Sequence, residues 1–537
     1  MKPFVAPLDD ILFSLNHIAK AEQVDSWDED FTREIGQHFA AFAEGEIAPL
    51  DEPGDREGCR LTDGRVQMPA GFKDVYLALA GQGWQGLTAP EQFDGQAMGA
   101  IVHGITSEIF SGACHSLQMV TGLVPGAIRT ILKFGSEDQQ NRLIPPMVDG
   151  RWLATMCLTE PGAGSDLSQV RCKAVQENDG WRITGEKIFI SGGDQDLSDG
   201  ILHLVLARTS DEGVKGLSLF LCQSEKSDGS RNEISVTRIE EKMGLHASPT
   251  CQLAFDGAEA ELIGQQGDGL KAMFTMMNHA RLDVALQGVA HAARSYDVAT
   301  AYAAERVQGR NAKGEKVTLD QHADVRRMLD ECDAFALGAR GIAHLALVAM
   351  ERDGRDPLVD FLTPLLKVHG TEAGMRAAEL GVQVLGGYGY LSEYRLEQTY
   401  RDARITAIYE GANGIHALTL VSRLLTGPQK AASDAFEAFI RQECENGDAS
   451  ALQEALTLWQ SLKDQVITVS DPTVVASDFM ALSIQLCLLL VWKRYQESLS
   501  EHPDQERMAR VLRMAQLDAV LKVKFYSEKV RQNLIAA

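Results

Sequence analysis

Residues 170–191 read VRCKAVQENDGWRITGEKIFIS. Two runs rich in β-forming residues flank the dipeptide Asp179-Gly180, a combination that strongly indicates a β-hairpin. Shorter runs of the same kind follow, separated by polar or glycine-rich segments: ILHLVLAR (201–208), GLSLFLCQ (216–223), ISVTRI (234–239) and TCQLAFDG (250–257). The middle of the chain is therefore predicted to form a compact antiparallel β barrel or sandwich.

Helical periodicity dominates on both sides of this β region. From about residue 30 to 150 apolar residues recur at helical spacing, and Ser136 with Gln139 has the pattern of a capping box. After Gly267 the helical period returns to about residue 425, enough for a helical bundle. The last 112 residues are also helical in pattern, with Pro428, Pro472 and Pro503 between the segments.

This order of helices, strands and helices predicts an α+β multidomain protein with segregated domains. The predicted domains are an N-terminal helical domain, a central β domain, a helical bundle and a helical C-terminal extension, at residues 1–152, 153–268, 269–425 and 426–537. The longest apolar run, 479–492, is shorter than the roughly 20 residues that span a bilayer, so it predicts a buried helix.

Composition excludes some kinds of partner. The formal net charge of -24 and pI of about 5.0 argue against nucleic acid or an anionic membrane. Nine scattered cysteines contain no CxxC and suit a reducing cytoplasm, and the acidic start of the chain predicts no targeting segment. No Glu has a His three residues later, and no two histidines lie within four residues of each other, so we expect no local metal-binding motif; ligands dispersed along the chain are the alternative.

A dinucleotide-binding motif is present only in form. Residues 81–86, GQGWQG, match GxGxxG. That motif needs a strand before the loop and a helix after it, whereas KDVYLALA in front is helical in pattern and the residues behind are rich in turn formers. We therefore expect a loop at the end of a helix.

Three segments carry residues suited to chemistry. In MCLTEPGAGSDL (156–167), the glycines let backbone amides approach a ligand, with Thr159 and Ser165 as hydroxyls; a simple turn is the alternative. In GEKIFISGG (185–193), Phe189 and Ser191 share one strand face, although an aromatic there is more often core. In ITAIYEGANGIHAL (405–418), Glu410 follows an apolar run, and the alternative is a surface turn.

Five motifs occur in the same order as in the acyl-CoA dehydrogenases: TEPGAGSD, KIFIS, ERVQGR, VQVLGGYGY and IYEG. The chain resembles that family over roughly residues 30–425. The segments APLDDILFSL (6–15) and EEKMGLHASPTC (240–251), with the long helical C-terminus, resemble the large branch that oxidises 3-methylmercaptopropionyl-CoA, a step of dimethylsulfoniopropionate catabolism.

The resemblance implies FAD-dependent α,β-dehydrogenation of a short or medium acyl-CoA to the trans-2-enoyl-CoA, with an electron-transferring flavoprotein as electron acceptor. It makes Glu410 the catalytic base. Abstracting a thioester α-proton needs a carboxylate shielded from water and raised in pKa, which the apolar residues before Glu410 favour. An acyl-CoA oxidase and a non-catalytic acyl-CoA-binding scaffold are the alternatives.

The resemblance also assigns binding residues. Those expected to bind FAD are Leu158, Thr159, Gly164, Ser165, Phe189, Ile190, Ser191, Arg306, Gln308, Gln383, Gly386, Gly387, Ala412 and Gly414. Those expected to bind the substrate are Ser165, Asn278, Arg281, Tyr409 and Gly411.

Some of these assignments have structural alternatives. Arg306 and Gln308 match positions that contact the FAD of a neighbouring subunit, which implies a homodimer or homotetramer, but Arg306 alone has the pattern of a helix-end cation. GGYGY, residues 386–390, also fits a helix C-cap and turn. Ala412 stands where the family has Thr, which removes a hydroxyl expected at the flavin.

Overall fold

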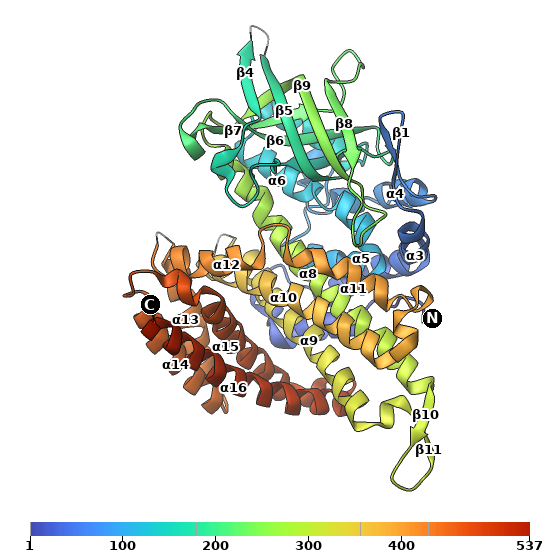
Figure 1. Ribbon diagram of the computed structural model, residues 1–537, viewed down its shortest axis with the longest axis vertical. Coiled ribbons are helices and arrows are strands. Elements are labelled where there is room, and N and C mark those ends of the chain that lie inside the picture. The colour runs from blue at the N-terminus through green and yellow to red at the C-terminus, as the bar shows by residue number, and fades with distance from the viewer. Residues whose placement is uncertain (1, 178–179, 355, 428, 537) are drawn as a thin grey trace. The chain divides into compact units, whose positions relative to one another are not determined.

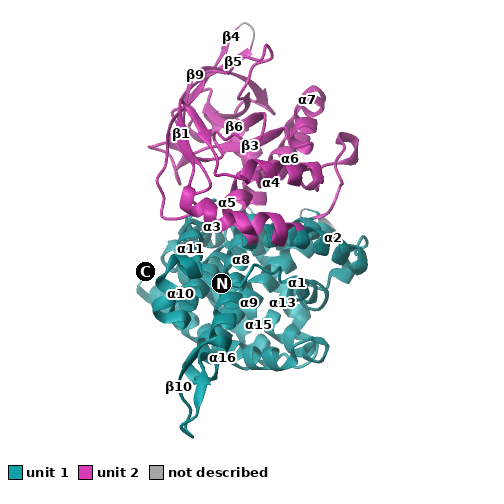
Figure 2. Ribbon diagram, turned by 90° about the vertical axis from the view of Figure 1, so that its right-hand side faces the viewer, with its two compact units in different colours: residues 1–41, 100–112, 281–537 teal, residues 42–99, 113–280 magenta. Residues whose placement is uncertain are grey.

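The computed structural model describes residues 2–177, 180–354, 356–427 and 429–536. The chain forms two compact units (Figure 2). Unit 1 comprises residues 1–41, 100–112 and 281–537, and unit 2 comprises residues 42–99 and 113–280. The α+β prediction is confirmed, while the four predicted domain boundaries stay predictions.

Unit 2 contains a seven-stranded sheet (Figure 1). Its strands are β3 (Trp152–Cys157), β4 (Lys173–Glu177), β5 (Gly180–Ser191), β6 (Gly200–Arg208), β7 (Leu217–Gln223), β8 (Ile234–Ile239) and β9 (Thr250–Ile263). The strand order is β3-β6-β4-β5-β9-β7, and an additional β6–β7 pairing closes the sheet into a barrel. The predicted β region is therefore present as a barrel.

The hairpin that led to the prediction is formed by β4 and β5. Ala174 pairs with Ile183, and both side chains are buried, as alternation along a strand requires. The turn residue Asp179 lies outside the described residues. One expectation was wrong: the sheet is not purely antiparallel, because β3 runs parallel to β6. Because β3 and β6 are parallel, the segment between them returns the chain to the end of the sheet at which β3 begins.

Helices of unit 2 precede the barrel in sequence: α3 (Ala48–Glu57), α4 (Phe72–Gly81), α6 (Val124–Phe134) and α7 (Glu137–Val148). The capping box at the start of α7 is confirmed, with Ser136 Oγ accepting from Gln139 N at 3.2 Å and Gln139 Oε1 accepting from Ser136 N at 3.1 Å. Helix α4 ends at Gly81, so GQGWQG is a loop after a helix, as predicted. The short hairpin β1 (Arg60–Thr62) and β2 (Arg65–Gln67) was not predicted.

Unit 1 is a helical assembly. Helices α5 (Ala100–Thr121) and α8 (Gly269–Glu305) have residues in both units, as does α2 (Glu29–Phe42), whose last residue, Phe42, belongs to unit 2. The other helices are α1 (Leu8–Phe13), α9 (Ala323–Asp353), α10 (Pro357–Leu385), α11 (Leu396–Arg404), α12 (Asn413–Thr419), α13 (Ala431–Cys444), α14 (Ser450–Val466), α15 (Ala476–Glu497) and α16 (Gln505–Ala536). A hairpin of β10 (Val307–Arg310) and β11 (Lys316–Thr318) follows α8.

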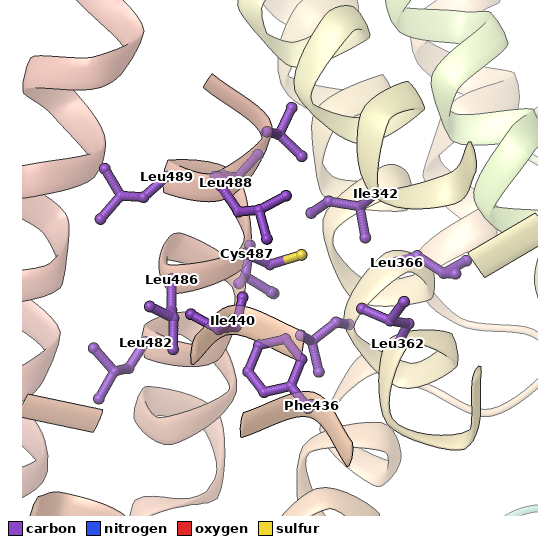
Figure 3. Close-up of a cluster of buried hydrophobic side chains, with 14 of the residues drawn as sticks. Ile342, Leu362, Leu366, Phe436, Ile440, Leu482, Leu486, Cys487, Leu488 and Leu489 are labelled. Atoms are coloured by element: carbon purple, nitrogen blue, oxygen red, sulfur yellow. The ribbon is translucent and has the colours of Figure 1, made fainter. Parts of the chain in front are cut away.

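The C-terminal helices share one hydrophobic core with the bundle. In Figure 3, Leu486 and Cys487 of α15 and Phe436 of α13 lie in the same buried cluster as Ile342 of α9 and Leu362 of α10. Burial of these side chains is the main stabilising contribution of such a cluster. Residues 426–537 are therefore an integral part of unit 1.

Two helical segments are long and apolar enough to cross a membrane, Ala323–Arg352 and Pro472–Glu497. Of their most apolar windows, 89% and 72% are buried inside the protein, as in core helices of globular proteins. The second segment contains the apolar run 479–492, which is thus confirmed as a buried helix.

Candidate active site

Glu410 lies in a tight turn between a short 3₁₀ helix, Ile405–Ala407, and helix α12. Its φ is 53°, and that of Gly411 is 90°, so two consecutive residues have left-handed backbone conformations. Glycine adopts such angles freely, but glutamate does so at a cost of about 1–2 kcal/mol. This local strain must be maintained by contacts from the surroundings.

The surroundings of the Glu410 carboxyl group raise its pKa, as a catalytic base requires. Burial raises its pKa to about 7, and the positive charges of Arg281 and Lys367 oppose the rise. Its Oε2 atom is buried and has no hydrogen-bond partner among the described residues. An ionised carboxylate with an unsatisfied oxygen can accept a proton from a ligand beside it.

Side chains from three helices contact the turn's main-chain carbonyl groups. Arg281 of α8 donates from Nε to the Glu410 carbonyl oxygen at 3.3 Å, and His416 of α12 lies with Nε2 3.1 Å from the same oxygen. Lys367 of α10 donates from Nζ to the Gly411 carbonyl oxygen at 2.8 Å. The backbone of the turn is therefore fixed by positively polarised groups.

Each of the predicted substrate residues near Glu410 has a different environment. Tyr409 donates its hydroxyl to Gln287 Oε1 on α8. The guanidinium of Arg281 contacts the Glu410 backbone, so an assignment to the nucleotide end of CoA stays a prediction. Asn278 is exposed on α8. Gly411 accepts the hydrogen bond from Lys367, which sequence reasoning did not identify.

The predicted flavin loop of unit 2 follows β3. Glu160 and Ala163 pair through both main-chain hydrogen bonds, at 2.9 and 3.0 Å, which forms a tight turn. Leu158 is buried at the start of this loop, whereas Gly164 and Ser165 are exposed. Ile188 N donates to Thr159 O at 2.9 Å, so the loop is attached to β5. The structure thus brings the TEPGAGSD and KIFIS motifs together.

Strand β5 has a bulge where the aromatic residue lies. Phe189 has φ of 59° and is 60% exposed, and the β5–β9 register shifts between Lys187 and Ile190. A bulge interrupts the alternation at this point, so the expectation that Phe189 and Ser191 share one strand face stays a prediction. Ile190 is buried and Ser191 is half-buried. A strained, exposed phenylalanine is typical of a binding surface.

Sequence reasoning missed the ion pair beneath this loop. Lys187 is fully buried and donates to Glu160 Oε1 at 2.8 Å and to Leu158 O at 3.0 Å. Glu160 also accepts from the main-chain nitrogens of Arg171 and Cys172, at 2.7 and 3.0 Å. Glu160 lies in the TEPGAGSD motif and Lys187 in the KIFIS motif, so a charged residue of each sign in these two motifs could have indicated the pair.

Another group of predicted FAD residues gathers at the end of α10. The Arg306 guanidinium lies 5.5 Å from the centre of the Tyr388 ring, which belongs to the GGYGY segment. This segment forms a 3₁₀ helix over Gly386–Tyr390, directly after α10 ends at Leu385. Helix α8 stops at Glu305, the first residue of the ERVQGR motif, and residues 307–310 form strand β10. Gln308 and Gln383 are exposed, as Arg306 is.

In each unit, taken by itself, some of the residues predicted to bind FAD leave room for a ligand beside the backbone. Four of the predicted glycines have no atom within 4 Å of the position that a Cβ would occupy, which leaves room for a ligand close to the backbone: Gly164, Gly386, Gly387 and Gly414. Ala412 is the N-cap residue of α12, directly before its first residue, Asn413. The exposed Phe189 offers an aromatic surface to a planar ring.

Models of three acyl-CoA dehydrogenase domains match the chain: the N-terminal domain at residues 29–151, the middle domain at 155–258 and the C-terminal domain at 267–425. The chain belongs to the acyl-CoA dehydrogenase family. The chain is therefore an oxidoreductase.

Particular members show strong similarity. The 3-methylmercaptopropionyl-CoA dehydrogenase of Ruegeria pomeroyi is 41% identical over 446 residues, covering 78% of this chain and 76% of that protein. A broad-specificity linear acyl-CoA dehydrogenase of Mycobacterium tuberculosis is 34% identical, covering 80% and 77%. A Bacillus anthracis acyl-CoA dehydrogenase complexed with FAD has the same fold, with a TM-score of 0.77, 20% identity and coverage of 95% and 90%. These similarities support a dehydrogenase over an oxidase or a non-catalytic scaffold.

Proposed function

We propose that this protein catalyses the FAD-dependent α,β-dehydrogenation of a short or medium acyl-CoA thioester, with Glu410 as the base. The observation that carries this proposal is the half-buried Glu410, whose pKa is raised to about 7 and whose Oε2 has no hydrogen-bond partner in the described part of the chain. At neutral pH such a carboxylate is ionised in a substantial fraction of molecules and is basic enough to remove a weakly acidic proton.

In this reaction Glu410 takes the α-proton, and the Cα–H electron pair becomes the new carbon–carbon double bond as a hydride leaves Cβ. FAD, when bound, supplies the acceptor for that hydride. The carbonyl contacts from Arg281, Lys367 and His416 keep Glu410 in place. Orientation of this kind lowers the barrier because the base need not be ordered during the reaction.

3-Methylmercaptopropionyl-CoA is the substrate we propose. Its support is the 41% identity to the Ruegeria pomeroyi enzyme named for that thioester. The test is a kcat/KM panel with propionyl-, butyryl-, octanoyl- and 3-methylmercaptopropionyl-CoA. We expect the sulfur-containing thioester to have the highest value, and a higher value for octanoyl-CoA would contradict this choice.

We also propose an electron-transferring flavoprotein as electron acceptor, a cytoplasmic location and a homodimer or homotetramer. An electron-transferring flavoprotein structure from Acidaminococcus fermentans is among the similar structures, at 26% identity. The exposed aromatic surface at Tyr388 and Tyr390 beside Arg306 supports contact with a second copy. Reoxidation of the reduced enzyme by this flavoprotein and by oxygen, compared at equal concentrations, tests the acceptor.

The decisive experiment for the base is Glu410→Gln. This amide is nearly the same size but cannot accept the proton, so we expect kcat to fall by about 10²–10⁴ while FAD remains bound. The absorbance of bound FAD shows that the variant is folded. A folded, FAD-containing variant with undiminished kcat would refute the assignment of Glu410 and the proposed mechanism with it.

A further inference from the structure

The turn that carries Glu410 is held by side chains of neighbouring helices, some of them far away in the sequence. Glu410 and Gly411 both have positive φ, and a Cβ on Gly411 would lie 3.0 Å from His416 Nε2. Glycine is therefore needed at 411 for its backbone angle and for space. Nothing in the turn's own sequence compensates the unfavourable angle of Glu410, so its stability must come from outside contacts.

Lys367 supplies one such contact. Its side chain is fully buried, and Nζ donates to Gly411 O at 2.8 Å and to Asn413 Oδ1 at 2.9 Å. Asn413, the first residue of α12, also donates from Nδ2 to Thr371 Oγ1 on α10 at 3.2 Å. The lysine thus connects the turn and the start of the following helix to α10.

His416 supplies a second contact, to the neighbouring carbonyl group of the turn. It is buried, and burial together with the charges of Arg281 and Lys367 lowers its pKa to about 3. The ring is therefore neutral at any pH at which the enzyme would be assayed. A neutral imidazole can still donate one N–H, and Nε2 at 3.1 Å from Glu410 O is in position to do so.

The two contacts differ in charge. Lys367 is a cation close enough to Glu410 to oppose the burial-driven rise of that carboxyl's pKa. Burial lowers the pKa of Lys367 itself to about 8, so the lysine is mostly charged at neutral pH. His416 carries no charge. Other charged groups around the turn, among the described residues, include Arg281 on α8, Arg423, whose charge adds to burial in lowering the pKa of Arg281, and Glu372 on α10, whose pKa is raised by burial.

We propose that Lys367 and His416 are positioning residues that hold the catalytic base by its main-chain carbonyl groups, with Lys367 also contributing, beside Arg281, to the protonation equilibrium of the base. This inference rests on the proposed function. It assigns two separable roles, because only one of the two side chains is charged. Removing either contact loosens the strained turn, although Arg281 still donates to the Glu410 carbonyl oxygen, and removing Lys367 also takes away a nearby positive charge.

The test compares four variants with the wild-type holoenzyme. His416→Leu removes the donor, and His416→Gln replaces the ring with an amide donor. Lys367→Met removes both the donor and the charge, while Lys367→Gln keeps a donor and removes the charge. Each is assayed for kcat and KM separately, for kcat/KM as a function of pH, and for bound-FAD absorbance and thermal unfolding to confirm folding.

We expect His416→Leu to lower kcat about ten- to a hundredfold, since small displacements of a reacting group have effects of this size, without moving the pH profile. His416→Gln restores most of the kcat. Lys367→Met lowers kcat similarly and moves the acid limb of kcat/KM upward by about one pH unit or more. Lys367→Gln moves the acid limb but loses less kcat.

Two results would overturn the inference. One is wild-type kcat and pH profile in folded Lys367→Met and His416→Leu; the other is an equal shift of the profile in both, which a neutral histidine cannot produce. Parallel measurement of Glu410→Gln separates these outcomes from a failure of the proposed function. If Glu410→Gln is inactive while the other variants behave as wild type, only the positioning roles are wrong.

Discussion

The ammonium nitrogen of Lys187 lies 2.8 Å from Oε1 of Glu160, inside the barrel unit and away from solvent. The same nitrogen donates to the Leu158 carbonyl oxygen at 3.0 Å. One lysine of β5 thereby attaches the loop after β3 to the strand that carries the exposed Phe189. Both predicted flavin-binding segments depend on this buried ion pair for their positions.

Lys187→Met should weaken FAD binding. The substitution leaves Glu160 buried without its cation, and breaking a buried pair in this way costs about 3–5 kcal/mol of stability. We expect the Kd for FAD, titrated into apoprotein by fluorescence, to rise at least tenfold, with a lower Tm. Arg142→Met is the matched control because its partner, Glu261, and Arg142 itself are largely exposed. Equal effects of the two substitutions would contradict a special role for Lys187.

The rate should depend on pH through Glu410. Because burial raises the pKa of this carboxyl to about 7, the reactive carboxylate is lost as pH falls below that value. kcat/KM for the free enzyme should therefore decline below pH 7 and approach a tenfold loss per pH unit. The profile is measured from pH 5.5 to 8. An acid limb near the ordinary glutamate pKa, or a flat profile, would contradict the prediction.

Glu410 should also make stability depend on pH. Its pKa is about 7 in the folded protein against an ordinary value of 4.5, so the folded state binds more protons between these values. The free energy of unfolding contributed by this group therefore decreases as pH rises from about 4.5 to 7. Glu410→Gln removes this dependence.

The corresponding measurement is thermal unfolding of wild type and Glu410→Gln at several pH values. Relative to wild type, the variant should gain stability progressively up to pH 8, by at most about 3 kcal/mol. The difference between the two proteins should be smallest at pH 4.5. A difference that shrinks as pH rises would show that the carboxyl pKa is not raised by folding.

A second buried ion pair stabilises unit 1. Arg340 of α9 donates from Nη2 to Glu108 Oε1 of α5 at 2.7 Å, and both side chains are only 1% exposed. Glu108→Leu leaves the arginine unpaired and should lower the free energy of unfolding by about 3–5 kcal/mol. The double variant Glu108→Leu with Arg340→Met should recover much of this loss. Asp434→Ala, in an exposed pair with Lys430, is the control and should change stability by less than about 1 kcal/mol.

Local patterns in the sequence predicted much of the fold. The β4–β5 hairpin, the capping box at Ser136 and the buried apolar helix are confirmed because each depends on residues close together in the chain. The β1–β2 hairpin was overlooked although Asp63-Gly64 supplied a turn signal, both residues having positive φ. By contrast, the alternation of apolar and polar residues in the sequence does not reveal the bulge at Phe189.

The site was predicted only in part. The motifs predict Glu410 as the base, a role that stays a prediction, and they include the two segments that meet at β5, since these residues are contiguous in the sequence. Lys367 lies 44 positions from Gly411 and 46 from Asn413, so no local spacing indicates that they meet. Their contact follows from how α10 packs beside the turn. Long-range contacts of this kind need the three-dimensional structure.

The hydrophobic core of unit 1 contains residues from both ends of the chain, from Phe13 and Ile18 to Val523 and Val530. During synthesis this core cannot close until residues up to about Val530 have left the ribosome. Apolar surfaces of α9 and α10 therefore stay uncovered while the last helices are translated, a period in which nascent chains are prone to aggregate. We conclude that a stop codon shortly after residue 425 would yield a polypeptide dependent on chaperones, even though every family motif had already been made.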